Sequence, residues 1–130
     1  MGTAGGFGIN RIGQIAVNVK DLDRAVAFYR DALGMRPLFQ VTKLAFFDCG
    51  GVRIMLSLPE TPEFDHPASV IYYAVDDIQS AHAVLRGRGV GFEGEPHVVA
   101  RLKDHDLWMA FCRDPEGNVL ALMSEVGRSA

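Results

Sequence analysis

The sequence predicts an α+β domain made of two β-α-β-β-β modules whose sheets curl into a cup. Apolar residues alternate along several short stretches, as in half-buried strands, and recur at helical spacing in two longer ones. The second half of the chain repeats the first, with Asp21 corresponding to Asp77, 56 positions later, and Asp48 to Asp114, 66 positions later. The length of 130 residues is typical of one domain.

The first module begins with an alternating stretch, 12–19, that predicts a strand. Asp21 then caps a helix, and Gly34 ends it because glycine tolerates the left-handed backbone that often follows a helix. Apolar residues recur at helical spacing between these two: Leu22, Val26, Tyr29 and Leu33. Three short strands are then predicted: 37–41, 44–48 and 52–58.

The second module follows a proline-containing stretch, 59–67, which predicts a linker. A strand over 70–75 leads to a second helix that Asp77 caps and that Gly87 and Gly89 close. The remaining predicted strands are 91–93, 97–102, 107–112 and 118–124. We therefore expect a flexible tail over 1–8 and a single domain over 9–127, with modules at about 11–58 and 68–125.

Composition and charge argue against several classes of partner. The net charge is −3 and the basic residues are scattered, unlike a nucleic-acid-binding surface. The N-terminus lacks the basic and apolar regions of a signal peptide, and no apolar run approaches the length of a membrane span. Cys49 and Cys112 are then expected to be reduced thiols. These features predict a cytoplasmic protein that binds neither nucleic acid nor membrane.

The predicted cup follows from strand alternation. In each module the helix covers one face of the sheet, and every second residue of a strand points to the other face. The expected lining residues are Gln14, Ala16, Asn18, Arg53, Met55, Ser57, Val70, Tyr72, Ala74, Val119, Ala121 and Met123. A concave, mostly apolar surface with a few polar groups is typical of a small-molecule site.

Three stretches carry a family resemblance: IGQIAVNVKDLDRAVAFYRDALG, VDDIQSAHAVLRGRG and DLWMAFCRDPEGNVLALMSEV. Together with the paired modules, they make residues from about 11 to 125 resemble the vicinal oxygen chelate superfamily, which includes glyoxalase I, bleomycin-resistance proteins and extradiol dioxygenases. The resemblance implies the glyoxalase/bleomycin-resistance-like fold and a homodimer, because many relatives build each cup from two chains. It identifies no reaction, because members include lyases, isomerases, dioxygenases, thiol transferases and drug-sequestering proteins.

The metal-dependent members of that superfamily place one ligand, typically His, Gln or Glu, on each of the four cup strands. The resemblance maps these positions to Gln14, Met55, Val70 and Ala121. Only Gln14 could bind a divalent ion, and a neutral amide is a poor ligand alone. We therefore predict no metal ligands and no cofactor, with Ala121 marking a lost or never-present ligand. A divalent metal could bind only through a non-standard site.

Two histidines are the candidate catalytic residues. His97 and His105 are predicted on strands that flank a turn at Lys103 and Asp104. They could form half of a metal site, or one could act as a general base near neutral pH. The alternative is that each is a hydrogen-bonded surface or loop histidine.

The other polar and aromatic candidates also have two interpretations. Gln14 and Asn18 could orient a ligand, or could bond each other and water. Arg53 could hold an anionic group, or could lie at the cup rim or pair across a dimer interface. Tyr72 and Trp108 could stack on an aromatic ligand or fill core volume, and packing is favoured for Trp108. Glu116, in the turn before the last strand, is expected to be solvated.

The leading functional hypothesis is a protein that binds a small apolar or aromatic molecule in a metal-free cup, as bleomycin-resistance-like proteins do. Its predicted ligand-binding residues are Gln14, Asn18, Arg53, Met55, Tyr72, Trp108, Ala121 and Met123. The alternative is an enzyme of the same superfamily, a glyoxalase-like lyase or isomerase or a dioxygenase-like member. It would use a displaced metal site or metal-free catalysis by His97 or His105. A regulatory or structural role is a third class, which no sequence feature supports.

Overall fold

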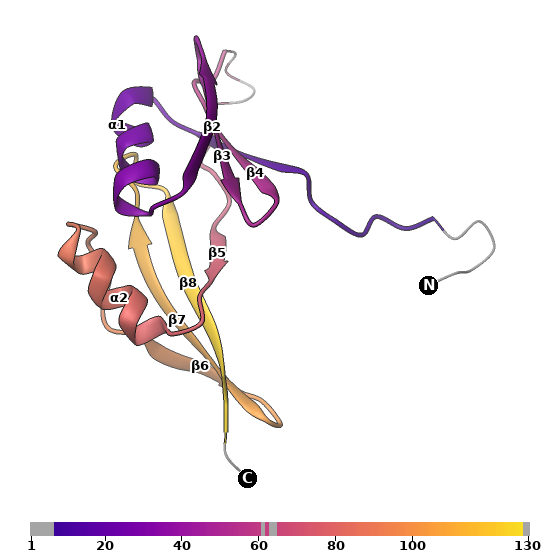
Figure 1. Cartoon of the computed structure of the whole chain (residues 1–130), viewed down its shortest axis with the longest axis vertical. Coiled ribbons are helices and arrows are strands. Elements are labelled where there is room, and N and C mark those ends of the chain that lie inside the picture. The colour runs from indigo at the N-terminus through magenta and orange to yellow at the C-terminus, as the bar shows by residue number, and fades with distance from the viewer. Residues whose placement is uncertain (1–6, 61, 63–64, 129–130) are drawn as a thin grey trace.

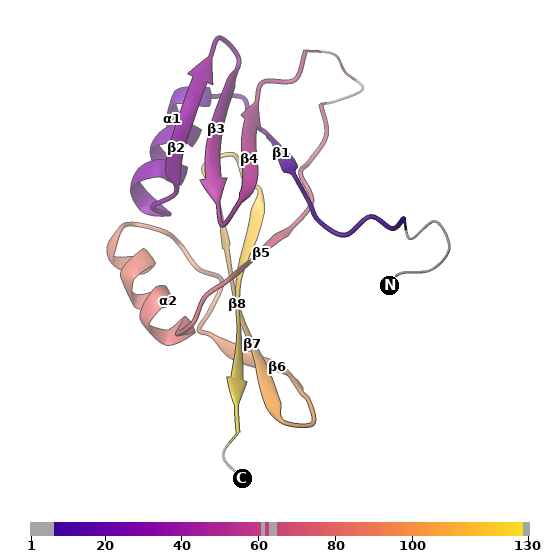
Figure 2. The ribbon, with the colours of Figure 1, turned by 45° about the vertical axis from the view of Figure 1, so that its right-hand side comes forward.

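The computed structural model describes residues 7–60, 62 and 65–128, and the chain forms two modules that follow one another along its long axis (Figures 1 and 2). The first contains β1 (Gln14–Asn18), α1 (Leu22–Ala27), the π-helical turn η1 (Phe28–Ala32), β2 (Arg36–Val41), β3 (Leu44–Cys49) and β4 (Val52–Ser57). The second contains β5 (Ile71–Ala74), α2 (Ile78–Gly87), β6 (His97–Arg101), β7 (His105–Arg113) and β8 (Val119–Gly127).

Each module forms one four-stranded sheet, and the two sheets have the same topology. The strand orders are β1-β4-β3-β2 and β5-β8-β7-β6. In each sheet the first strand pairs in parallel with the last, and all other pairs are antiparallel. Helices α1 and α2 lie on the same side of the molecule (Figure 1). The predicted α+β fold of two β-α-β-β-β modules is confirmed.

Both helices begin at the predicted caps. The Asp21 carboxylate accepts a hydrogen bond from the Arg24 backbone N–H at 3.0 Å, and that of Asp77 accepts one from Ser80 N–H at 3.1 Å. These bonds satisfy donors that the first helical turn leaves without partners. Gly34 ends the first helical segment with a φ of +75°, a conformation that an L side chain rarely adopts.

One predicted strand is wrong. Residues 91–93 contribute only an isolated bridge between Phe92 and Cys112. Gly91 and Gly94 flank the bridge, with a φ of +111° at Gly94, and Pro96 has no N–H to donate to a ladder. These residues therefore interrupt the segment before it can pair as a strand.

Two apolar cores lie between the helices and the sheets. The first contains the buried residues Val17, Val19, Leu22, Ala25, Tyr29, Ala45, Phe47, Ile54 and Leu56. The second contains Ile78, Leu85, Val90, Ala110, Cys112, Leu120 and Leu122. Phe28 and Leu33, at the end of the first helical segment, pack against both. The cores are thus continuous through this segment, which fixes the modules relative to each other.

Polar contacts reinforce the same junction. Glu116, in the β7–β8 turn, accepts hydrogen bonds from the Asp21 backbone N–H at 2.9 Å and from Arg24 Nη2 at 3.1 Å. Its side chain is only 8% exposed, so the expectation that it is solvated is wrong. The physical reason is a partner from the other module, which local turn chemistry does not show. Glu116 is a cross-module cap at the start of α1.

The Glu116 contacts predict a pH-dependent contribution to stability. Burial raises the pKa of this carboxyl, but hydrogen bonds from the Asp21 and Lys20 N–H groups and from Arg24 outweigh it and hold the pKa below its ordinary value. A lowered folded-state pKa stabilises the fold above the unfolded-state pKa, about 4.3, and this contribution is lost as the pH falls through the folded-state pKa. We expect Glu116→Gln to cost about 1 kcal/mol at pH 7.

Urea denaturation at pH 7 and at successively lower pH measures this difference. The gap in unfolding free energy between wild type and Glu116→Gln should close as the carboxyl protonates. Glu95→Gln is the matched control, because Glu95 is 76% exposed and faces Arg86 at 3.6 Å. A gap that stays constant with pH would contradict the proposed role of the charge.

The segment before β1 extends away from the body of the molecule (Figure 1). Phe7 and Ile9 are 88% and 90% exposed, and Gly13 accepts the Arg53 backbone N–H at 3.0 Å. Residues 1–6 of the predicted tail lie outside the described residues, so the tail stays a prediction. Within the part of the chain that is described, no helix has the length and apolar character to cross a membrane.

Candidate functional site

Each sheet has a face that its helix does not cover, and we call these the open faces. On the first sheet the register aligns four open-face residues across the strands: Gln14, Arg53, Asp48 and Arg36. Arg53 Nε donates to Gln14 Oε1 at 2.7 Å, and Arg36 lies 3.6 Å from Asp48. This row is polar and crosses the whole sheet.

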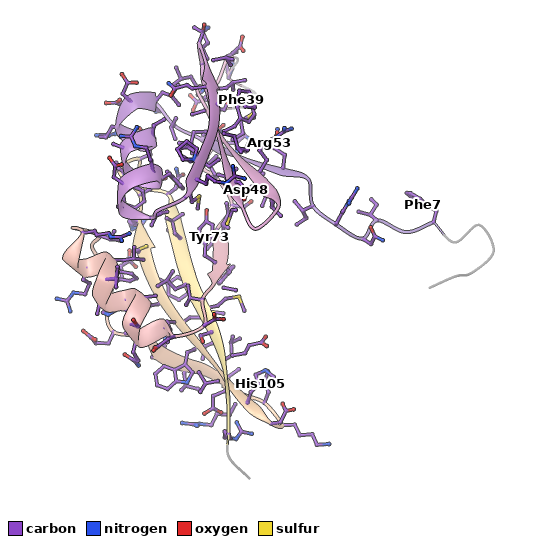
Figure 3. The ribbon with its side chains drawn as sticks, viewed as in Figure 1. Phe7, Phe39, Asp48, Arg53, Tyr73 and His105 are labelled. Carbon is purple, nitrogen blue, oxygen red and sulfur yellow. The ribbon has the colours of Figure 1, made fainter. Side chains whose placement is uncertain are left out.

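The neighbouring row on the first open face is apolar. It consists of Ala16, Met55, Phe46 and Phe39. The rings of Phe39 and Phe46 stack with their centroids 4.4 Å apart, and the Arg53 guanidinium lies 5.4 Å from the Phe46 ring centroid. Phe39 is 51% exposed. Phe39 and Arg53 therefore present an exposed aromatic surface beside a cation, and Figure 3 shows both on the first sheet.

The second open face contains Ala121, the position predicted to mark a lost or never-present metal ligand. The register places Ala121 between Tyr72 on β5 and Phe111 on β7. The two rings meet edge to face with centroids 6.3 Å apart, and Ala121 is 0% exposed. The next row contains Ala74, Met123, Met109 and His97. Ala121 is therefore covered by aromatic side chains and does not line an open site.

The residues at the family's metal-ligand positions do not fit a divalent ion. The Gln14 amide is already used, because its Oε1 accepts from Arg53 and its Nε2 donates to Met55 Sδ at 3.5 Å. Val70 and Ala121 carry no donor atom. Within residues 7–60, 62 and 65–128, no group of three or more His, Cys, Asp or Glu side chains is placed to hold a metal ion.

The two candidate histidines lie on the second open face but far from each other. His97 pairs with Met109, which is four residues from His105 along β7, so the histidines are separated by roughly 13 Å. His105 is half-buried, with Nδ1 2.8 Å from Asp104 Oδ1 and Nε2 4.0 Å from Glu125. His97 is exposed, and its Nδ1 lies 3.1 Å from the Glu95 carbonyl. Within one chain they cannot form half of a metal site together.

Trp108 does not share a surface with the other candidates. It alternates with Met109 on β7 and packs against the second core, on the side that α2 covers. Trp108 therefore lies on the opposite face of the sheet from the other predicted ligand-binding residues of the second module, and the packing interpretation fits its position. The reason is strand parity: Leu107, Met109 and Phe111 occupy the open face, which leaves Trp108 on the other.

Asn18 lies at the end of its open-face row, next to the linker. Its Nδ2 donates to the His66 carbonyl at 2.8 Å, and its own carbonyl accepts from Asn118 Nδ2 at 3.3 Å. A polar cavity of about 440 Å³ adjoins it, lined in part by His66 and Glu116. These contacts tie the linker to both modules and place Asn18 at their junction.

Sequence reasoning missed the contribution of β2, β3 and β7 to the open faces, because the predicted lining came only from the first and last strands of each module. Phe39, Phe46, Met109 and Phe111, on these other strands, supply much of the apolar surface. Alternation within 44–48 and 107–112 could have found three of them. Phe39 could not be found in this way, because an irregularity between Pro37 and Phe39 shifts the register of β2.

The open faces remain exposed within one chain. Tyr72 is 47% exposed and Val70 is 40% exposed, as expected for surfaces that no second sheet covers. The two sheets follow one another along the long axis, so one chain does not enclose these residues within its described part (Figure 2).

Comparisons with known proteins agree with the architecture. A model of the Glyoxalase/Bleomycin resistance protein/Dioxygenase superfamily matches residues 11–122. The Bacillus subtilis protein YraH is 27% identical over 123 residues, which cover 84% of this chain and 94% of YraH.

Solved structures are similar in fold. A lactoylglutathione lyase from Agrobacterium tumefaciens has a TM-score of 0.74 and 22% identity, over 90% of this chain and 95% of that one. A superfamily member from Sphaerobacter thermophilus has a TM-score of 0.76 and 24% identity, over 90% and 98%. At these identities the likeness concerns the fold alone.

Proposed function

Because the chain belongs to the Glyoxalase/Bleomycin resistance protein/Dioxygenase superfamily, we propose that it binds a small apolar or aromatic molecule in a cup without the usual metal ligands. The observation that carries this proposal is the aromatic covering of the open faces. Tyr72 and Phe111 meet over Ala121 on one face, and Phe39 stacks on Phe46 on the other. Exposed rings of this kind offer large contact area to a planar apolar ligand.

The cup is proposed to form between two copies of the chain. Each copy exposes two open faces whose apolar residues include Phe39, Val41, Val70 and Tyr72. Contiguous exposed apolar surface of this kind is typical of interaction sites. The first sheet of one copy facing the second sheet of the other would enclose a shared space and bury these side chains. The homodimer is thus part of the proposal.

Arg53 suggests which ligands such a cup would prefer. Its Nε donates to Gln14, which orients the guanidinium, whereas its terminal nitrogens have no hydrogen-bond partner among the described residues. A carboxylate or phenolate could accept from those nitrogens while its ring contacts Phe39. We therefore expect aromatic acids to bind more tightly than their neutral analogues.

A panel of aromatic carboxylates and matched alcohols, tested by calorimetry, checks the proposal. For a bound acid such as naphthoate, we expect Phe39→Ala and Arg53→Gln each to weaken binding by about fivefold or more. Leu102→Ala is the control, because Leu102 is 45% exposed and lies in the β6–β7 turn.

Two results would overturn this function. One is the absence of binding by any aromatic compound, or binding that neither Phe39→Ala nor Arg53→Gln weakens. The other is a stoichiometric metal, found by elemental analysis of protein purified without chelator, on which an activity depends.

A second candidate function is that of an enzyme of this superfamily that works without a metal, and the residue that supports it is His105. Its Nδ1 pairs with Asp104 at 2.8 Å, an arrangement that can orient an imidazole as a general base. Register places His105 opposite Gly127, six residues along β8 from Ala121, so it lies far from the aromatic row of its own chain. Replacing His97 and His105 by glutamine should abolish any measured turnover, and unchanged turnover would remove both from the mechanism.

A further inference from the structure

We propose a second ligand site, separate from the open faces, in an apolar cavity between the modules on the helix-covered side. The cavity has a volume of about 340 Å³, within the range of small-molecule sites. Residues from both modules line it, among them Leu33, Met35, Cys49, Tyr73, Leu85 and Arg88. We infer that it takes an apolar carboxylic acid whose body carries a further hydrogen-bond acceptor.

The cavity is distinct from the proposed cup because successive side chains of strand β5 point alternately to the open face and to the cavity. Tyr72 points to the open face, where it meets Phe111, and Tyr73 packs against the second core and lines the cavity. Figure 3 shows Tyr73 between the two modules. A molecule in the cavity would contact the residues that hold the modules together, not the aromatic rows.

The charge at the cavity selects the ligand's head group. Among the described residues that line it, Arg88 alone carries a charge. Its Nη1 donates to the Ala32 carbonyl at 3.1 Å, which fixes the guanidinium beside the apolar walls, and the residue is exposed. An anionic group at this edge would keep contact with water and pair with a positioned cation. A carboxylate is the simplest group with these properties.

Tyr73 supplies the internal polar contact. Its hydroxyl oxygen is buried and has no hydrogen-bond partner among the described residues. Burial, with a smaller contribution from Cys49, raises the pKa of this phenol above its ordinary value, so it stays a neutral donor. Buried hydroxyls in folded proteins normally have a partner. A ketone or ether oxygen on the body of the ligand would accept this hydrogen bond.

Cys49 provides a reporter at the cavity wall. Its thiol is half-buried, whereas the other cysteine, Cys112, is 2% exposed in the second core. Burial raises the pKa of the Cys49 thiol, with Asp48 adding to the effect, so alkylation is best followed above neutral pH. Cys112 should react only when the protein unfolds, and therefore serves as an internal control.

The experiment uses peptide mass spectrometry to measure the rate at which N-ethylmaleimide alkylates Cys49. The ligands are decanoate, below its micellar concentration, and oxo acids, which are decanoates that carry one ketone group. We expect decanoate to slow the reaction at Cys49 and not at Cys112. Arg88→Gln should weaken this protection by about tenfold. Arg86→Gln, in the last turn of α2 and 61% exposed, should leave it unchanged. At least one oxo acid should protect more strongly, and Tyr73→Phe should remove that increment alone.

Three outcomes would overturn the proposal. One is the absence of protection by any acid, and another is protection that Arg88→Gln does not weaken. The third is a Cys49 that does not react in the absence of ligand but becomes reactive when the protein is diluted. This result would mean that a second copy of the chain covers the cavity at the higher protein concentration. If oxo acids protect no better than decanoate, the assignment of Tyr73 as a donor to the ligand is wrong.

Discussion

Replacing Asp114 with alanine is expected to destabilise the protein by about 3–5 kcal/mol. Asp114 is a buried carboxylate, 5% exposed, in the β7–β8 turn. One oxygen accepts the backbone N–H groups of Glu116 and Asn118, each at 2.9 Å. The other accepts the Tyr29 hydroxyl and the Asn118 side-chain amide, also at 2.9 Å. The alanine variant would leave all four donors without this acceptor.

The Tyr29 hydroxyl makes the expected loss large. Tyr29 is 0% exposed in the first core, and its ring packs against Phe28 and Phe47. Burial, with the nearby Asp114 charge, raises the pKa of this phenol, so it remains a neutral donor. Without Asp114 the hydroxyl would be desolvated with no acceptor in place, a defect that costs more than an exposed hydrogen bond. The bond also joins the two modules.

The repeat itself offers a matched control for Asp114→Ala. Asp48 is the equivalent residue of the first module, and its Oδ1 accepts the Gly51 N–H at 3.2 Å in the corresponding turn. Its side chain is 32% exposed, so Asp48→Ala should cost only about 1 kcal/mol. Urea denaturation of both variants measures the difference, and a Tyr29→Phe cycle isolates the coupling to Asp114. Equal losses at Asp48 and Asp114 would contradict the cross-module role.

The contrast between Asp48 and Asp114 shows what local pattern can and cannot predict. The spacing of the repeat identified the two residues as equivalent and predicted the two modules. The Tyr29 partner lies 85 residues away, and it depends on how the modules pack, which neither alternation nor turn chemistry encodes. The same reason explains Glu116, whose partners at the start of α1 belong to the other module.

Strand faces were predictable because side chains alternate with a period of two. Alternation placed Arg53, Met55, Tyr72 and Ala121 on the open faces, and the sheet registers agree. It could not show that Tyr72 and Phe111 meet over Ala121, because cross-strand neighbours depend on register. Sequence reasoning therefore found the part of the candidate site that lies on the first and last strands of each module, and the structure supplies the neighbours of these residues.

The second large effect is expected at Ala121, where glutamate should destabilise the protein by about 3–5 kcal/mol. Ala121 is 0% exposed beneath Tyr72 and Phe111. A larger side chain must either separate the two rings or carry its carboxylate into an apolar environment. Neither Tyr72 nor Phe111 offers a cation to pair with that charge. The loss would be measured as a fall in urea midpoint.

The repeat again supplies the control, and the comparison distinguishes two explanations for an alanine at position 121. Met55 is the equivalent residue, half-buried on the first open face, and Met55→Glu should cost only about 1 kcal/mol because Arg53 lies nearby on the same face. If Ala121→Glu were as mild as Met55→Glu and bound a divalent metal, the rings would be easily displaced. Ala121 would then be a ligand position that lacks only its side chain. A large loss without metal binding would instead mean that the aromatic pair has replaced the ligand, so that one substitution cannot restore a metal site.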